Sequence, residues 1–296
     1  MSGYEESLHI LRTDMIVKAQ IKQSYVYMLQ IRILSNIIKG DAIFMKLIFN
    51  ADDFGYSKGV NLGIVETFRR GLVRSTTIMA CMPGFCDAVL LARKNSNLKI
   101  GIHLMLTTGK SILAGHKTIT NASGNFFTQN EFLAKIQNKE IDLLEVEAEF
   151  EAQIQKVIAK RITPVHFDSH HHVHNLPGII EIFLKLAKKY DTKVRINDRN
   201  LLIGEYGAIQ TTEAFYSGFY GEDATCDKLK DVLTSYIDVG VRSLEIMCHP
   251  AFIDYTLHST SIYTINRAYE VDILTNKDIK NFVTKNKLQI CSFEDI

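Results

Sequence analysis

From residue 45 onward, short apolar runs alternate with segments in which apolar residues recur at helical spacing. This alternation is typical of βα units that build a parallel sheet. It predicts strands at residues 47–50, 76–80, 99–106, 165–168, 193–196, 243–248 and 288–292. Long helices are predicted at residues 143–160 and 178–190. Because roughly six to eight such repeats close or nearly close a barrel, we predict an α/β fold, a distorted or incomplete (β/α) barrel.

The first predicted helix has recognisable ends. Ser57 is a residue type that caps helix N-termini, and Val60, Ile64 and Phe68 follow at helical spacing. Gly71 stands where a C-terminal glycine stop is expected. The sequence therefore predicts a complete βα unit at the start of the barrel.

Two stretches do not fit the alternation. Residues 107–141 are polar, contain a turn near Gly124 and are predicted to form an insertion or lid over one end of the barrel. Residues 1–44 precede the first strand and carry no candidate catalytic group. They are either a helical extension, with residues 25–38 as an interaction arm, or part of a reading frame that lies upstream of the true translation start at Met45. Residues 45–296 are predicted to form a single catalytic domain.

Composition excludes several classes of protein. The 34 basic and 33 acidic residues are interspersed, so no basic stripe is available for nucleic acid. No apolar run approaches the roughly 20 residues needed to span a bilayer, and the N-terminus does not resemble a secretory signal. The five cysteines are scattered and odd in number, which favours a reducing, cytoplasmic compartment. A homodimer is a hypothesis without a self-complementary sequence patch to support it.

Candidate chemistry gathers where predicted strands end, which is where α/β enzymes place reactive groups. Asp52 and Asp53 follow the first strand. Adjacent strand residues point to opposite sides, so one carboxylate can hold a metal ion while the other accepts a proton. The competing interpretation of this pair is a helix cap in a strand-to-helix turn.

Histidines are concentrated in one short segment. Residues 166–174 contain five of the chain's ten histidines together with Asp168. Imidazole is a common neutral metal ligand, so a metal site is favoured over an exposed histidine-rich loop. Asp168 and His170 share strand parity, and His172 and His174 follow if the extended geometry lasts. Some of these residues are expected to orient the ligands, with Asp168 accepting an N–H from a ligand histidine.

Four further residues lie at or near strand ends, and three of them, all but Cys248, are candidates for the site. His103 lies in an apolar strand, where a single histidine is either a ligand or a core residue. His249 ends another apolar strand and is a candidate general acid, or else a loop histidine that caps a carbonyl. Cys248 has apolar neighbours and is read as an inert buried thiol. Arg195 follows a predicted strand and either orients a carboxylate, grips a sugar hydroxyl, or is a solvated surface charge.

Several of these stretches together resemble the YdjC-like carbohydrate deacetylase family, and within it the bacterial chitooligosaccharide deacetylases. The matching stretches are NADDFGYSKG at 50–59, IGIH at 100–103, HFDSHHHVH at 166–174, FYGE at 219–222 and EIMCHPAFID at 245–254. The resemblance runs from about Met45 to the C-terminus. It implies a barrel of the glycoside hydrolase/deacetylase type and one divalent metal ion, held by an aspartate of the pair and by His103 and His170.

By the same resemblance, Asp52 is the base and Asp53 the ligand, with the exchanged assignment as the alternative. The predicted substrate is an N-acetylated amino sugar, chitobiose or a short chitooligosaccharide. The hypothesis is that the metal ion activates water and polarises the acetyl carbonyl, while Asp52 removes a proton and His249 donates one to nitrogen, so that acetate is released. The resemblance implies Mg²⁺, whereas two imidazoles favour Zn²⁺ or another transition metal. The alternatives are a metal-dependent phosphoesterase and an inactive sugar-binding protein.

Overall fold

A computed structural model describes residues 44–296. The predictions for the preceding residues, an interaction arm or an upstream frame, lie outside the described part of the chain. No helix in the described part is both long enough and apolar enough to cross a lipid bilayer.

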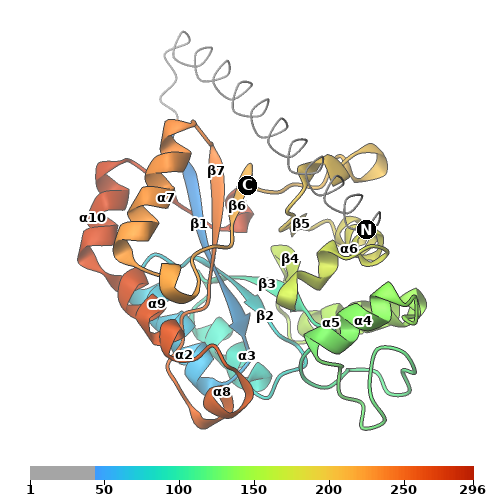
Figure 1. The fold of residues 1–296 in the computed structure, drawn as a ribbon. Helices are drawn as coiled ribbons and strands as arrows, with labels where there is room; N and C mark the ends of the chain where they lie inside the picture. Colours follow the sequence, from blue (N-terminus) through green and yellow to red (C-terminus); the bar gives the residue numbers. More distant parts are fainter. Residues whose placement is uncertain (1–43) are drawn as a thin grey trace, which may run out of the picture.

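A curled parallel sheet forms the centre of the molecule (Figure 1). Its strands are β1 (Lys46–Phe54), β2 (Ser75–Ile78), β3 (Lys99–Leu104), β4 (His166–Ser169), β5 (Lys193–Val194), β6 (Ala214–Tyr216), β7 (Ser243–Cys248) and β8 (Gln289–Ile290). The order is β5-β4-β3-β2-β1-β7-β6, and β8 pairs with the start of β1. The two edge strands, β5 and β6, do not pair with each other. The sheet is therefore an open half-barrel, which confirms the predicted incomplete (β/α) barrel.

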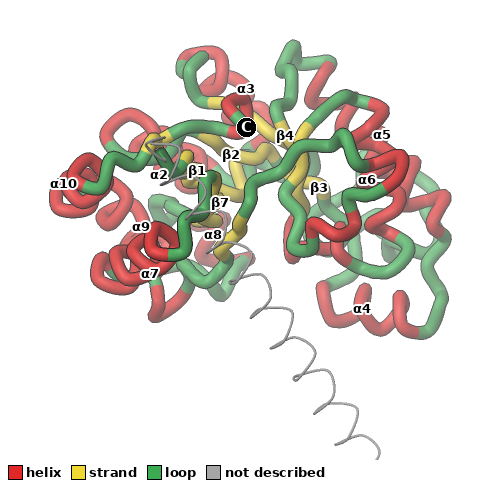
Figure 2. Tube along the Cα trace, turned by 90° about the horizontal axis from the view of Figure 1, so that it is seen from above, coloured by secondary structure: helices red, strands yellow, loops and turns green. Residues whose placement is uncertain are grey.

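Helices surround this sheet, and Figure 2 shows the strands in the middle with helices on both sides. They are α2 (Lys58–Arg70), α3 (Phe85–Lys94), α4 (Gln129–Gln137), α5 (Leu143–Ile158), α6 (Ile179–Lys189), α7 (Cys226–Asp238), α8 (Tyr255–Thr260), α9 (Ile265–Thr275) and α10 (Lys277–Lys285). The hydrophobic core lies between the sheet and the surrounding helices, and it includes the fully buried Phe49, Phe150 and Phe183.

All seven predicted strands are present in the predicted order, and their order is more accurate than their ends. Strand β6 was missed because it has only three half-buried residues at an open edge and therefore no buried apolar run. The predicted strand at residues 193–196 shortens to the two residues of β5. Helices α5 and α6 agree with their predicted ranges to within two residues at each end.

Helix α2 begins as predicted, since the Ser57 hydroxyl accepts the N–H of Val60 at 3.2 Å. The explanation for Gly71 was wrong. Its φ of −125° is not left-handed, so no glycine stop of the usual kind is present. Glycine is needed there because a Cβ would lie 2.4 Å from the carbonyl oxygen of Leu274 at the end of α9. Close packing of α2 against α9, rather than turn geometry, accounts for this glycine.

The segment at residues 107–141 is an insertion between β3 and α5 that ends in helix α4. Glu149 of α5 is fully buried and accepts hydrogen bonds from the N–H groups of Ile112 (2.9 Å) and Leu113 (3.1 Å). It also lies 3.0 Å from the His116 Nε2. Glu145 of the same helix accepts the N–H groups of Lys117 and Thr118, so two carboxylates of α5 hold the loop against the barrel.

Candidate active site

A cavity of about 480 Å³ opens where the carboxyl ends of the central strands meet. The candidate residues that line it are Asp52, Asp53, His103, His170, His172 and His249. Thr108 and Gln129 of the insertion also line it, so the insertion forms part of the cavity wall. Asp168, His174 and Arg195 are fully buried and lie behind the lining.

Strand β1 brings both adjacent aspartates to this cavity, and it does so through a local distortion. In an undistorted strand, neighbouring side chains point to opposite faces. Between β1 and β2 the register runs from Ala51↔Thr76 to Phe54↔Ile78, so β1 carries one extra residue. Asp53 has φ of 72° within this bulge. The expectation that the two carboxylates face opposite sides was wrong, because a bulge re-aims the side chain.

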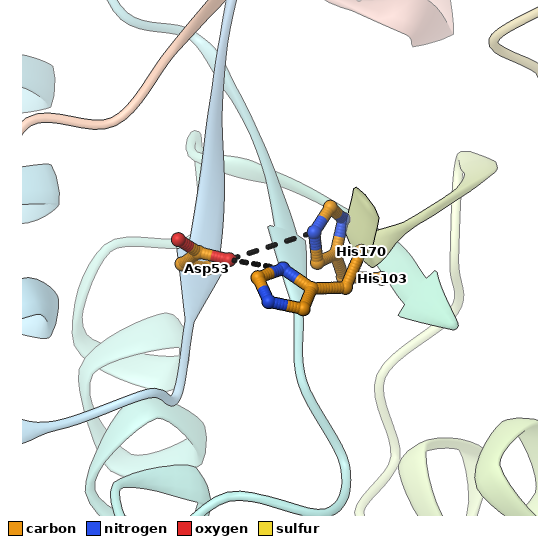
Figure 3. A group of neighbouring side chains, drawn as sticks. All are labelled: Asp53, His103 and His170. Carbon is orange, nitrogen blue, oxygen red and sulfur yellow. Dashed lines mark ion pairs between the residues drawn. The ribbon is translucent and has the colours of Figure 1, made fainter. Parts of the chain in front are cut away.

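Asp53, His103 and His170 form one compact group (Figure 3). The Asp53 Oδ1 lies 3.5 Å from the Nε2 of His103 and 3.2 Å from the Nδ1 of His170. His103 comes from the end of β3, and His170 comes directly after β4. All three elements end at the same edge of the sheet, which explains why residues far apart in sequence meet here.

The other oxygen of Asp53 faces a residue that the sequence interpretation did not identify. The Nη2 of Arg267, on α9, lies 2.8 Å from the Asp53 Oδ2. Burial alone would raise the pKa of Asp53, but Arg267 and the two histidines hold it well below its usual range. Asp53 is therefore ionised at neutral pH, with Oδ1 directed to the histidines and Oδ2 to the guanidinium.

This group fits a small divalent cation. One carboxylate oxygen and two imidazole nitrogens lie within 4.8 Å of one another. Ligands at about 2.1 Å from an ion are separated from each other by about 3.0 Å in an octahedron and about 3.4 Å in a tetrahedron. The spacings of 3.2 Å and 3.5 Å lie close to these values. The residues present can therefore hold such an ion with little rearrangement.

The second nitrogen of His103 is held by Asp168. The Nδ1 of His103 lies 2.7 Å from the Asp168 Oδ1, so the Nε2 faces Asp53. Burial would lower the pKa of His103, but Asp168 outweighs burial and raises it to about 9. A carboxylate behind a histidine is the usual arrangement for orienting a metal-binding imidazole.

Asp52 has different partners from Asp53. Arg195 donates to both of its oxygens at 2.7 Å, in a bidentate pair. Asn50 donates to the Asp52 Oδ1 at 2.8 Å. Burial would raise the pKa of Asp52, but Arg195 holds it below its ordinary value. Asp52 is thus a rigid, ionised carboxylate at the cavity wall.

Arg195 itself is completely buried, so its interpretation as a solvated surface charge was wrong. It lies 2.9 Å from the Asp168 Oδ2 and 2.6 Å from the Glu245 Oε1, in addition to Asp52. Burial raises the pKa of Glu245 to about 7 even beside this guanidinium. Asp52, His103 and Asp168 also approach one another as ligands would, but the Arg195 charge lies against both carboxylates there. A cation is therefore favoured at Asp53 instead.

His249 follows β7 and lies beside two tyrosines, Tyr220 and Tyr263. Its backbone N–H donates to Glu270 of α9, whereas its ring Nδ1 is buried without a hydrogen-bond partner among residues 44–296. Burial, and secondarily Arg267, lower the pKa of His249 to about 4. The ring is therefore neutral at neutral pH in the free protein and can accept a proton.

The rest of the histidine run does not continue the strand. After Ser169 the chain enters a short 3-10 helix, His170–Asn175, in which His171 and His172 have φ of 55° and 54°. His172 still reaches the cavity, but His174 packs on Phe183 with its Nδ1 2.6 Å from the Ser169 Oγ. The expectation that His174 faces the cavity was wrong, because the turn ends the alternation on which it relied.

Sequence reasoning missed the contribution of α9. Arg267 and Glu270 are three residues apart on one helical face, and both are buried. Charged residues at this spacing normally lie in solvent, so the pattern gave no signal of a functional role. Cys248, by contrast, is buried with a pKa raised far above its ordinary value, as expected for an inert thiol.

The chain is similar to several known proteins over most of its length. The family described as YdjC-like protein matches residues 46–285. Carbohydrate deacetylase 1 of Listeria innocua serovar 6a is 39% identical over 252 residues, which cover 85% of this chain and all of the relative. A carbohydrate deacetylase of Brevibacillus brevis is 40% identical over 259 residues, with 85% of this chain and all of the relative covered.

A solved structure is similar over the same part of the chain. It belongs to a protein of Enterococcus faecalis V583 whose name gives it as a candidate cellobiose-phosphate cleavage protein. The two chains are 33% identical with a TM-score of 0.79, and the match covers 85% of this chain and 98% of the other.

Proposed function

The chain belongs to the YdjC-like family and is a carbohydrate deacetylase, and from this premise we propose that it hydrolyses the N-acetyl group of short chitin-type oligosaccharides with a divalent cation. The observation that supports the cation is the group of Asp53, His103 and His170 at the carboxyl edge of the sheet. The cavity beside it is large enough for a sugar unit.

Amide hydrolysis needs an activated water, stabilisation of the developing oxyanion and a proton for the leaving nitrogen. A divalent cation bound at Asp53, His103 and His170 would acidify a water and polarise the acetyl carbonyl. Two imidazoles favour zinc or another transition metal, and one carboxylate with open positions also admits magnesium.

The chain's own residues move the protons in this proposal. Asp52 is ionised and held in place by Arg195, so it accepts the proton of the attacking water. His249 delivers a proton to the departing nitrogen. Because its pKa of about 4 leaves the ring neutral in the free protein, the ring first takes up a proton from solvent in the enzyme–substrate complex and then passes it to nitrogen, while the proton of the attacking water goes from Asp52 back to solvent. Acetate and a free amino sugar are released.

We place this reaction in the cytoplasm. Within the part of the chain that the structure describes, all five cysteines are free thiols, which agrees with a reducing compartment. The phosphoesterase alternative gains no support, since such enzymes commonly use a second metal ion. The second group of potential ligands here is paired with Arg195 instead.

The test is acetate release from N,N′-diacetylchitobiose by protein treated with a chelator and then supplied with magnesium or zinc. We expect release that is lost with the chelator and restored by one of the ions. A phosphate ester is assayed in parallel. Turnover of the phosphate ester alone would reject the proposed reaction, and release that the chelator does not affect would reject its metal dependence.

A further inference from the structure

Two tyrosines form the cavity wall beside His249. The rings of Tyr220 and Tyr263 are stacked, with centroids 3.9 Å apart and planes inclined by 13°. Tyr263 is 8% exposed, whereas Tyr220 is 45% exposed. One ring of the stack is thus covered, and the other is open toward solvent and the cavity.

The covered ring is firmly anchored. The hydroxyl of Tyr263 donates to the Glu270 Oε1 at 2.6 Å and accepts the N–H of Gly221 at 3.0 Å. Gly221 directly follows Tyr220, so the second of these hydrogen bonds also fixes the backbone next to the open ring. A side chain held in this way presents its surface at little entropic cost.

The position of His249 leaves the outer face of Tyr220 uncovered. The His249 ring centroid lies 5.6 Å from that of Tyr220 and 5.9 Å from that of Tyr263, at interplanar angles of 80° and 79°. A ring nearly equidistant from two stacked rings lies beside the stack, at their edges. It therefore covers neither outer face, and Tyr263 covers only the inner face of Tyr220.

We propose that the outer face of Tyr220 is the surface on which the reacting sugar ring stacks, with its acetamido nitrogen directed to His249. This inference rests on the proposed function. A pyranose has a face of C–H groups that packs well on an aromatic ring, and tyrosine supplies rigid contact area with two side-chain torsions. The edge-on His249 then lies next to the same sugar, where a proton donor to nitrogen is needed.

The experiment compares Tyr220→Ala, Tyr220→Phe and Tyr255→Ala with the parent protein. Tyr255 is a matched control, because it is 85% exposed and does not line the cavity. Acetate release gives KM and kcat for N,N′-diacetylchitobiose, and calorimetry gives the affinity for the deacetylated disaccharide without turnover. Melting temperatures verify folding, which an exposed side chain should affect little.

We expect Tyr220→Ala to raise KM and to weaken product binding by about tenfold, with kcat within about twofold of the parent. Tyr255→Ala should match the parent, because Tyr255 does not line the cavity, and Tyr220→Phe should bind the sugar more tightly than Tyr220→Ala, because the ring is retained. Unchanged KM and affinity in Tyr220→Ala would overturn the inference, as would a fall in kcat alone, which would mean that Tyr220 acts on His249.

Failure of the proposed function has a different signature. If the parent binds the sugars in a manner that depends on Tyr220 but releases no acetate, stacking stands and the deacetylation proposal falls. If the parent binds neither acetylated nor free amino sugars, both are overturned.

Discussion

Asp52 and Asp53 are neighbours in sequence with the same side chain, yet their surroundings give them different chemistry. Asp53 shares one oxygen with two histidines, which is the environment of a ligand. Asp52 has both oxygens paired with Arg195, and this pairing fixes its orientation without any histidine in direct contact. The partners therefore favour Asp52 as the proton acceptor and Asp53 as the ligand, and not the exchanged assignment.

Substitutions at these positions should separate turnover from metal binding. Asp52→Asn keeps the size of the side chain and leaves the Asp53 group intact, so we expect normal metal stoichiometry with acetate release reduced at least about a thousandfold. His170→Ala removes one ligand and should lose the metal itself. Metal analysis of dialysed protein, together with the acetate assay, measures both effects. Full activity in Asp52→Asn, or full metal content in His170→Ala, would contradict the assignment.

A second residue-scale prediction concerns acid stability. His166 is fully buried and stacks on Phe293, with ring centroids 3.8 Å apart, and within the described part of the chain neither of its ring nitrogens has a hydrogen-bond partner. Burial lowers its pKa from 6.5 to about 3. Between these values the unfolded chain binds a proton that the folded protein does not. The contribution of His166 to the free energy of unfolding is therefore lost as the pH falls below 6.5, and the loss is about 2 kcal/mol at pH 5.

His166→Phe keeps a flat ring against Phe293 but cannot titrate. We expect its free energy of unfolding to fall less than that of the parent between pH 7.5 and pH 5, by about 2 kcal/mol. Urea denaturation at several pH values measures this difference. The other buried histidines are present in both proteins and contribute equally to both plots of unfolding free energy against pH. The difference between the two plots therefore reports on His166 alone. Parallel profiles would show that His166 is not the source of the linkage.

At the scale of elements, the order of strands and helices followed from apolar periodicity, but local distortions did not. The residues at strand ends, such as His103, were identified because parallel strands end at one edge. The bulge at Asp53 and the positive φ at His171 and His172 depend on how β1 and β4 meet their neighbours. No period in the sequence records such contacts, so the directions of Asp53 and His174 were mispredicted.

The contribution of α9 was hidden for a related reason. Whether Arg267 is solvated or buried depends on which face of α9 packs against the barrel, and a charged side chain gives no apolar signal for that face. Its ion pair with Asp53 joins the last third of the chain to the first strand. Only the tertiary structure shows that this helix supports the site.

The insertion is the element whose anchoring can be tested most directly. In Glu149→Ala, the N–H groups of Ile112 and Leu113 lose their acceptor. We expect their hydrogen exchange to speed up at least about tenfold while the strands stay protected, since an unsatisfied buried group costs about 1–3 kcal/mol. Because Thr108 of the same segment lines the cavity, KM should rise more than kcat falls.

Glu147→Ala is the control for the insertion. Glu147 is on the same helix, but its ion pair within the described part of the chain is with Lys185 and not with the loop, so its removal should leave the loop amides protected. Equal exchange in both variants would mean that the loop is held by contacts other than Glu149.

At the scale of the whole molecule, the site joins β1 to β3, β4 and β5, strands with which β1 does not pair directly in the sheet. Asp53, His103 and His170 belong to β1, β3 and the turn after β4, and Arg195 links β1 to the strand end at β5. An ion that binds only the folded arrangement stabilises the entire domain by mass action. Global stability is therefore a measure of occupancy that does not depend on turnover.

We accordingly expect the melting temperature of chelator-treated protein to rise when the correct cation is added at about 100 times its Kd. The stabilisation is then about 2.7 kcal/mol, or roughly 5–10 °C for a domain of this size. His170→Ala should show no rise, whereas His258→Ala, at an exposed position on α8, should behave as the parent. Differential scanning calorimetry with each ion in turn measures the effect and ranks the ions. Binding through Asp53, His103 and His170 must stabilise the fold that brings them together. The assignment is therefore contradicted if no divalent cation changes the melting temperature of the parent protein, or if His170→Ala shows an equal rise.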